Sequence, residues 1–168
     1  WLAGPVSPTA KGAKKGWVQL SATEPPRWEG FYDDISVEIR PAGNGKAARW
    51  QAGALSGRLP QAKAVLSGSS SRLAPLALSR PDGRMLAAFV VDSGSYPGLE
   101  ALALSTPARA GEEDTDIFPV VMVFEPDLLD NWGMADKANA LLAERLVRAA
   151  GEYSDGTVIF DLTLNGHA

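Results

Sequence analysis

Short apolar runs recur through the second two-thirds of the chain. They cover residues 64–66, 85–91, 118–124 and 158–164. Strands that are buried on both faces have this pattern, and such strands usually belong to a parallel or mixed sheet that helices cover. The pattern therefore predicts a layered α/β domain.

A helical pattern lies between the last two runs. The predicted helix covers residues 135–150, and Gly151 is placed to end it. Glu144 and Arg148 form an i,i+4 pair on it. Its apolar face consists of Met134, Ala138, Leu141, Leu142, Leu146 and Ala149. A helix between two strands is a crossover connection, so we expect residues 118–124 and 157–164 to form adjacent or near-adjacent parallel strands.

The N-terminal half has a different pattern. Ile35, Val37 and Ile39 alternate with polar residues, as in a half-exposed strand, and a Pro- and Gly-containing turn follows them. Residues 33–52 are therefore predicted to form a β-hairpin. Residues 1–16, rich in Gly, Pro and Lys, are predicted to be a linker, and residues 17–168 a single domain.

These elements predict a fold class. We expect a mixed, mostly parallel sheet flanked by helices, of the flavodoxin-like kind, with an N-terminal β-hairpin. The length of 168 residues fits one domain of this size.

Composition excludes several classes of function. The chain has 16 Lys and Arg against 20 Asp and Glu, a net charge of −4, which argues against a nucleic-acid surface. It has no cysteine and one histidine, so it lacks a thiolate metal site, a cysteine nucleophile and a multi-histidine site. We expect no cofactor and no metal.

Polar residues gather where the predicted strands end. The candidate ligand-binding residues are Glu125, Asp127, Asn131, Asn139 and Asp161. The carboxylates among them have two interpretations. They could hold a hard divalent cation or act as a general acid and a general base. Alternatively, they cap a helical turn that begins at Pro126, which is the simpler role.

The two asparagines suggest a structural role in the same loop. We expect Asp127, Asn131 and Asn139 to form a clasp on the loop after the strand at 118–124, because an amide can both donate to and accept from loop backbone. Loss of the Asn139 amide would then reduce stability without removing a chemical activity.

Aromatic residues offer another candidate site. Trp28, Phe31, Tyr32 and Trp50 lie in the N-terminal half and could line a carbohydrate or peptide groove. Aromatic residues in a small sheet are more often packing residues.

Residues 60–168 resemble a known family. The matching positions are Asp127, Asn131, Gly133, Asn139, Asp161 and Gly166, in an acidic-Pro-Asp stretch, an Asn-x-Gly-Met turn, an Asp-x-x-Asn helix start and a final strand. The pattern resembles a domain-of-unknown-function family of bacterial membrane-anchored proteins related to the GldG-like auxiliary subunits of ABC transporters.

The resemblance implies both a fold and a setting. It implies a fold similar to class I glutamine amidotransferases without a working amidotransferase site. It also implies an extracytoplasmic, periplasmic domain anchored through membrane segments outside this sequence, with a protein partner such as subunits of a membrane complex. We therefore expect a non-catalytic domain acting in protein assembly or transport-associated binding. The alternatives are a metal-assisted hydrolase using Glu125, Asp127 and Asp161, or a glycan-binding module using Trp28, Tyr32 and Trp50.

Overall fold

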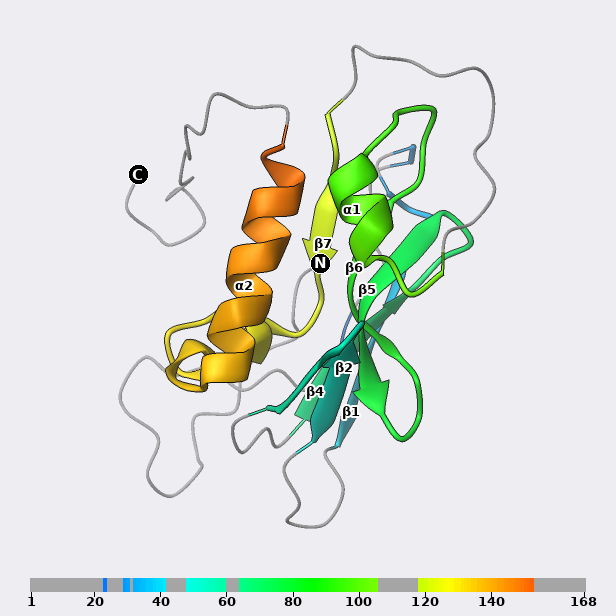
Figure 1. The fold of residues 1–168 in the computed structure, drawn as a ribbon. Helices are drawn as coiled ribbons and strands as arrows, with labels where there is room; N and C mark the ends of the chain where they lie inside the picture. Colours follow the sequence, from blue (N-terminus) through cyan, green and yellow to red (C-terminus); the bar gives the residue numbers. More distant parts are fainter. Residues whose placement is uncertain are drawn as a thin grey trace, which may run out of the picture.

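The computed structural model describes residues 23, 29–30, 32–41, 48–59, 64–105 and 118–152. Its strands are β1 (Ser36–Pro41), β2 (Arg49–Ala52), β3 (Leu55–Arg58), β4 (Ala64–Ser69), β5 (Leu73–Arg80), β6 (Met85–Val90) and β7 (Val121–Val123). Its helices are α1 (Pro97–Leu102) and α2 (Lys137–Ala150), with short 3-10 turns η1 (Pro126–Leu128) and η2 (Gly133–Ala135) between β7 and α2 (Figure 1).

The strands form one sheet in the order β1-β4-β6-β5-β2-β3, and β7 also pairs with β6. Each strand pair in the described part of the chain is antiparallel. The prediction of a mostly parallel α/β sheet, of the flavodoxin-like or class I glutamine amidotransferase-like kind, is therefore wrong. Short turns explain the difference: Gly53 and Gly83 adopt positive φ between consecutive strands, which leaves no room for a crossover helix.

The predicted hairpin over residues 33–52 is also wrong. β1 pairs with β4 from Ser36 opposite Ser69 to Pro41 opposite Ala64, whereas β2 pairs with β3 and β5. The tight turn at Gly53 directs β2 to β3 instead. The alternation around Ile35 does mark a strand, but its partner follows β3 in the chain.

The apolar run at residues 85–91 is buried on both faces, as its composition predicts. Leu86 and Phe89 belong to one core cluster, which includes residues of α2, while Ala88 and Val90 belong to a second cluster around Ile35. Both clusters can cover this strand without parallel neighbours. Burial on both faces is thus confirmed for this run, although it does not determine strand direction. It is wrong for the runs at 64–66 and 118–124, which are only partly buried, with Phe118 77% exposed.

The predicted helix is confirmed as α2. The Asp136 carboxylate caps it by accepting a hydrogen bond from the Ala138 N–H at 2.8 Å, and Gly151 follows its last residue. Glu144 and Arg148 form the expected ion pair at 2.9 Å. The buried face consists of Asn139, Leu142, Ala143 and Leu146. Leu141 is exposed, so this face is rotated from the predicted one.

Figure 1 shows α2 beside β7 and α1, at one side of the sheet. The predicted strand at 157–164 and the predicted linker at 1–16 lie outside the described residues. Among the helices of the described part, none is long and apolar enough to cross a membrane.

Candidate functional site

Glu125 lies at a junction within the sheet. One edge of β6 is shared: β4 pairs with it at Met85, and β7 pairs with it at Ala87–Phe89. Glu125 follows β7, and its Oε2 accepts a hydrogen bond from the Leu66 N–H of β4 at 2.8 Å. Its Oε1 accepts from the Asp127 N–H at 3.2 Å, which caps η1. The carboxylate thus joins β4 to the turn after β7.

Burial determines how Glu125 titrates. Glu125 is 2% exposed. Because burial disfavours the charged carboxylate, it raises the pKa of Glu125 to about 7, although the hydrogen bonds from two backbone N–H groups act in the opposite direction. Burial also raises the pKa of the partly exposed Asp127 to about 6, with Asp130 adding to the effect. Perturbed carboxyl groups often mark functional sites, but structural groups show the same shifts. Here the donors to Glu125 are backbone amides, one of β4 and one of the turn that follows β7, which favours the structural interpretation.

Asn139 is the centre of a buried hydrogen-bond network. Its Oδ1 accepts a hydrogen bond from the indole Nε1 of Trp50 at 2.6 Å. Its Nδ2 lies 3.1 Å from the Gly133 carbonyl oxygen and 3.4 Å from the carbonyl oxygens of Asp127 and Arg58. The amide therefore ties the first turn of α2 to the preceding loop and to both β2 and β3.

The structure brings three of the predicted site residues together. Glu125, Asp127 and Asn139 share the backbone of the η1 turn. Asn131 is exposed and takes no part in these hydrogen bonds, while Asp161 lies outside the described residues. We expected Asn131 to form a hydrogen bond with the backbone of this loop. Its neighbour Asp130 forms one instead, since the Asp130 carboxylate accepts a hydrogen bond from the Gly133 N–H at 2.6 Å. An Asp three residues before a Gly is the local signal that sequence analysis missed.

Of the aromatic candidates, the two that the structure describes lie against different parts of the core. Trp50 is 1% exposed and packs in the core, and Tyr32 is partly buried against the second cluster. Trp28 and Phe31 lie outside the described residues. The packing interpretation of Trp50 is therefore confirmed. The described residues also contain no group of three or more His, Cys, Asp or Glu side chains placed to hold a metal ion.

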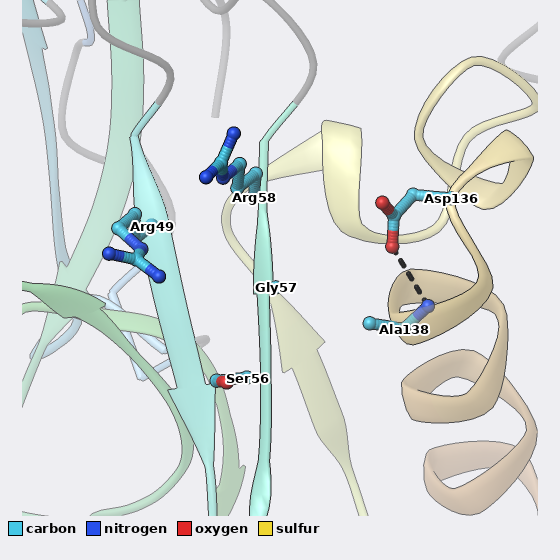
Figure 2. A pocket seen from close by; sticks show the side chains of 6 residues that line it. All are labelled: Arg49, Ser56, Gly57, Arg58, Asp136 and Ala138. Atoms are coloured by element: carbon cyan, nitrogen blue, oxygen red, sulfur yellow. Dashed lines mark hydrogen bonds between the residues drawn. The ribbon is translucent and has the colours of Figure 1, made fainter.

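A pocket of about 340 Å³ lies where β2 and β3 meet the first turn of α2. It is lined by Arg49, Ser56, Gly57, Arg58, Asp136 and Ala138. Figure 2 shows the two arginines on adjacent strands and Asp136 across from them at the start of the helix. Guanidinium groups cannot act as general bases, but they bind carboxylates and phosphates well.

The two arginines belong to a longer row. Arg49 lies opposite Arg58 on β3 and opposite Arg80 on β5. Residues directly opposite in antiparallel strands project from the same face, so the three side chains form a row across three strands. We call this set, Arg58, Arg49 and Arg80, the arginine row. Sequence analysis missed it because the row depends on strand register, which the sequence pattern did not provide.

Comparisons of the chain with protein-family models, with curated proteins and with solved structures found no match.

Proposed function

We propose that this chain is a non-catalytic binding domain, the extracytoplasmic part of a bacterial membrane-anchored protein that acts in protein assembly or transport-associated binding. One observation carries the non-catalytic part of this proposal. Glu125, Asp130 and Asp136 each accept hydrogen bonds from backbone N–H groups of their own loops. A general acid or base must face its substrate, whereas the Glu125 carboxylate is buried between β4 and β7.

The open pocket favours binding over hydrolysis. It presents two arginines and a serine, which can hold an anionic group but cannot activate a water molecule. The described acidic residue of this pocket, Asp136, is engaged in capping α2. The proposal therefore places binding at the pocket, at the β2–β3 end of the sheet, and a structural role at Glu125.

Metal titration tests the hydrolase alternative. We expect calorimetric titration of the chain with magnesium, calcium, manganese and zinc to give no stoichiometric micromolar isotherm, because Glu125 is buried on two backbone donors and the described residues hold no group of three or more acidic or histidine side chains placed for a metal ion. The Asp127→Asn variant serves as the matched control. A micromolar isotherm that this variant abolishes would favour the hydrolase and contradict the proposal.

The location rests on the sequence motifs of residues 60–168, not on the fold, which differs from the one that the resemblance implies. These 168 residues contain no cysteine, so labelling of a thiol introduced here, compared with the unsubstituted protein, reports the compartment of the domain. Glu144 is exposed on α2, so Glu144→Cys in the full-length protein places a thiol on the surface. We expect a membrane-impermeant maleimide to label it in intact spheroplasts. Labelling only after lysis would contradict an extracytoplasmic location.

A photo-crosslinking residue at Ser56 tests partner binding directly. Ser56 is exposed and lines the pocket, so a partner seated there would lie within reach. We expect full-length protein carrying this residue to form an adduct of defined size in its native membrane. The same residue placed at Glu144, on the far part of α2, should not form that adduct. Failure to form any specific adduct at Ser56 would count against binding at the pocket.

A further inference from the structure

We propose that the arginine row binds an acidic segment of a protein partner, with one carboxylate held between Arg49 and Arg58 in the pocket beside α2. This inference rests on the proposed binding function and names the chemistry of its partner.

The first support is a concentration of positive charge on neighbouring strands, which no ion pair among the described residues neutralises. Opposite residues of antiparallel strands are about 5 Å apart at their Cα atoms, and like charges placed there destabilise the sheet. Arg49 nevertheless lies between Arg58 and Arg80 in register. An anion bound across the row would remove this repulsion.

The second support is the contrast with other arginines. Arg40 and Arg84 pair with Glu38, Arg72 pairs with Asp34, and Arg148 pairs with Glu144. Within the part of the chain that the structure describes, Arg49 and Arg58 pair with no carboxylate. Arg80 donates to the neutral Gln51 side chain instead. Among the described residues, acidic side chains thus neutralise several surface arginines and leave Arg49 and Arg58 without an ion pair.

The pocket provides room for the carboxylate. Its volume of about 340 Å³ is at the lower end for a ligand site and is ample for one acidic side chain. Planar guanidinium groups match a carboxylate with two parallel hydrogen bonds. Ser56, on the same pocket wall, adds a hydroxyl that can donate to the second oxygen.

Asp136 favours a carboxylate over a phosphate. It lines the same pocket from the start of α2, and Figure 2 shows its carboxylate directed to the Ala138 N–H, with β3 between it and the two arginines in this view. The pocket is lined by two arginines and one aspartate, so its formal charge is +1, which a single carboxylate neutralises. A phosphate carrying nearly two charges would leave an excess of negative charge beside Asp136. This charge balance favours an Asp or Glu side chain.

The length of the row favours a segment over a small molecule. Arg80 lies one strand beyond the pocket, so the three positions span about 10 Å across the sheet. Acidic side chains at positions i and i+2 of an extended segment are about 7 Å apart and project from the same side. Such a segment can reach arginines on neighbouring strands, whereas a small carboxylate would occupy the pocket alone.

Fluorescence anisotropy with the complete 168-residue chain tests the inference. The probe is a fluorescein-labelled peptide of alternating Glu and Gly, and its Gln–Gly counterpart is the peptide control. We expect the Glu peptide alone to bind, with affinity that falls as salt rises. Because the chain carries a net charge of −4, binding of an acidic peptide would require a local positive surface.

Two substitutions and a matched control locate the binding. Arg49→Gln and Arg58→Gln together should weaken binding at least tenfold, and Arg58→Lys should weaken it less, because charge remains while the paired hydrogen-bond geometry is lost. Arg148 is exposed on α2, and Arg148→Gln removes one positive charge, as each of the Arg→Gln substitutions does. It should alter the affinity for the Glu peptide less than twofold. Thermal melting confirms that each variant is folded; relief of repulsion should leave melting temperatures unchanged or higher.

Several outcomes would overturn the inference. The first two are that the Glu peptide does not bind, and that Arg148→Gln weakens its binding as much as the substitutions in the row do. The other two are that inorganic phosphate displaces the peptide more strongly than free glutarate does, and that glutarate binds as tightly as the peptide. The last two would assign the row to phosphates or to small carboxylates. An unchanged Ser56 adduct in the Arg49→Gln, Arg58→Gln variant would overturn the carboxylate assignment alone, while the proposed binding function would stand.

Discussion

At the scale of single residues, buried polar side chains connect elements that the backbone ladders leave apart. Glu125 accepts the N–H of Leu66 where β4 leaves β6, and Asn139 joins α2 to β2 through Trp50. Glu125 accepts hydrogen bonds from backbone N–H groups, and Asn139 accepts one from the indole N–H of Trp50; without these side chains the donors would be buried without a hydrogen-bond partner. Their removal should therefore affect stability before any binding.

Glu125 makes stability depend on pH in a defined direction. Burial raises its pKa from 4.5 to about 7, so between these values the folded state binds more protons than the unfolded state. Its contribution to the free energy of unfolding is complete below pH 4.5 and is lost as pH rises through about 7, a change on the order of 3 kcal/mol. Asp127 acts with the same sign up to about pH 6. Urea unfolding at pH 5 to 8 should show this decrease.

Glu125→Gln provides the control for that slope. Gln cannot ionise, so most of the decrease between pH 5 and pH 7 should disappear in this variant. The pKa of Asp34 is lowered to about 2 by its hydrogen bond to Arg72, so Asp34 affects stability only at lower pH. A variant with the same slope as the natural chain would show that Glu125 does not titrate in this range.

Asn139→Ala should lower the free energy of unfolding by about 2 to 3 kcal/mol, because the Trp50 indole N–H and the Gly133 carbonyl lose a buried partner. A double-mutant cycle with Trp50→Phe should give a coupling of about 1 kcal/mol. Asn131→Ala is the matched control, and its exposed position predicts a change within about 0.5 kcal/mol. A large effect of Asn131→Ala, or additivity of Asn139→Ala with Trp50→Phe, would contradict this assignment.

At the scale of elements, the connection between β7 and α2 is built by close backbone approach. The turns η1 and η2 lie against each other, and Gly133 lies where they meet. A Cβ atom at Gly133 would lie 1.6 Å from the Asp127 backbone oxygen. The glycine thus allows the loop to fold back so that Asn139 reaches two of its carbonyl groups.

Gly133→Ala should destabilise the protein by about 3 kcal/mol, because the backbone atoms it meets cannot move aside without displacing η1. Gly98→Ala is a matched control: its Cβ comes closest to the Glu152 carboxylate, at 2.4 Å, and the nearest backbone atom is the Ala149 Cα at 3.3 Å. The Glu152 side chain can rotate away with the loss of one exposed hydrogen bond from the Gly98 N–H. We expect a change within about 1 kcal/mol there. Chemical denaturation of both variants measures the difference, and similar effects would contradict the close approach at Gly133.

At this scale the sequence predicted some elements well and others poorly. The limits of α2 were predictable because Asp136, Gly151 and the Glu144–Arg148 pair are local signals. The partner of β1 was not predictable, since pairing with β4 depends on a distant segment. Of the five candidate site residues, Glu125, Asp127 and Asn139 meet at the η1 turn because they are close in sequence, whereas Asn131 is exposed and Asp161 lies outside the described residues. The Trp50 contact and the arginine row join residues that only the sheet brings together.

At the scale of the whole molecule, β5 and β6 form the centre of the sheet. β6 is paired on both sides, with β5 on one side and β4 and β7 on the other. β1 and β3 end the strand order. Both core clusters also include residues of β5 and β6. The centre should therefore open only when the whole domain unfolds.

Hydrogen exchange should follow that arrangement. We expect amide protection to be greatest in β5 and β6 and least in β1 and β3, because edge strands open without disrupting the core. Native-state exchange followed by NMR measures protection strand by strand. Protection in β3 equal to that in β6 would show that α2 holds this edge as firmly as the sheet centre.

The shared edge of β6 has a mechanical consequence. β4 is in register with β6 at a single pair, Gly68 with Met85, whereas β1 and β4 pair along their whole length. Under tension applied through β1, three interactions would break first: the Gly68–Met85 pairing, the hydrogen bond from Leu66 N–H to Glu125, and the Glu38–Arg84 ion pair. The β1–β4 pair would then be released as one unit. The β5–β6–β7 part would still carry load. A pulling experiment would then record two successive ruptures, the first of them at the lower force.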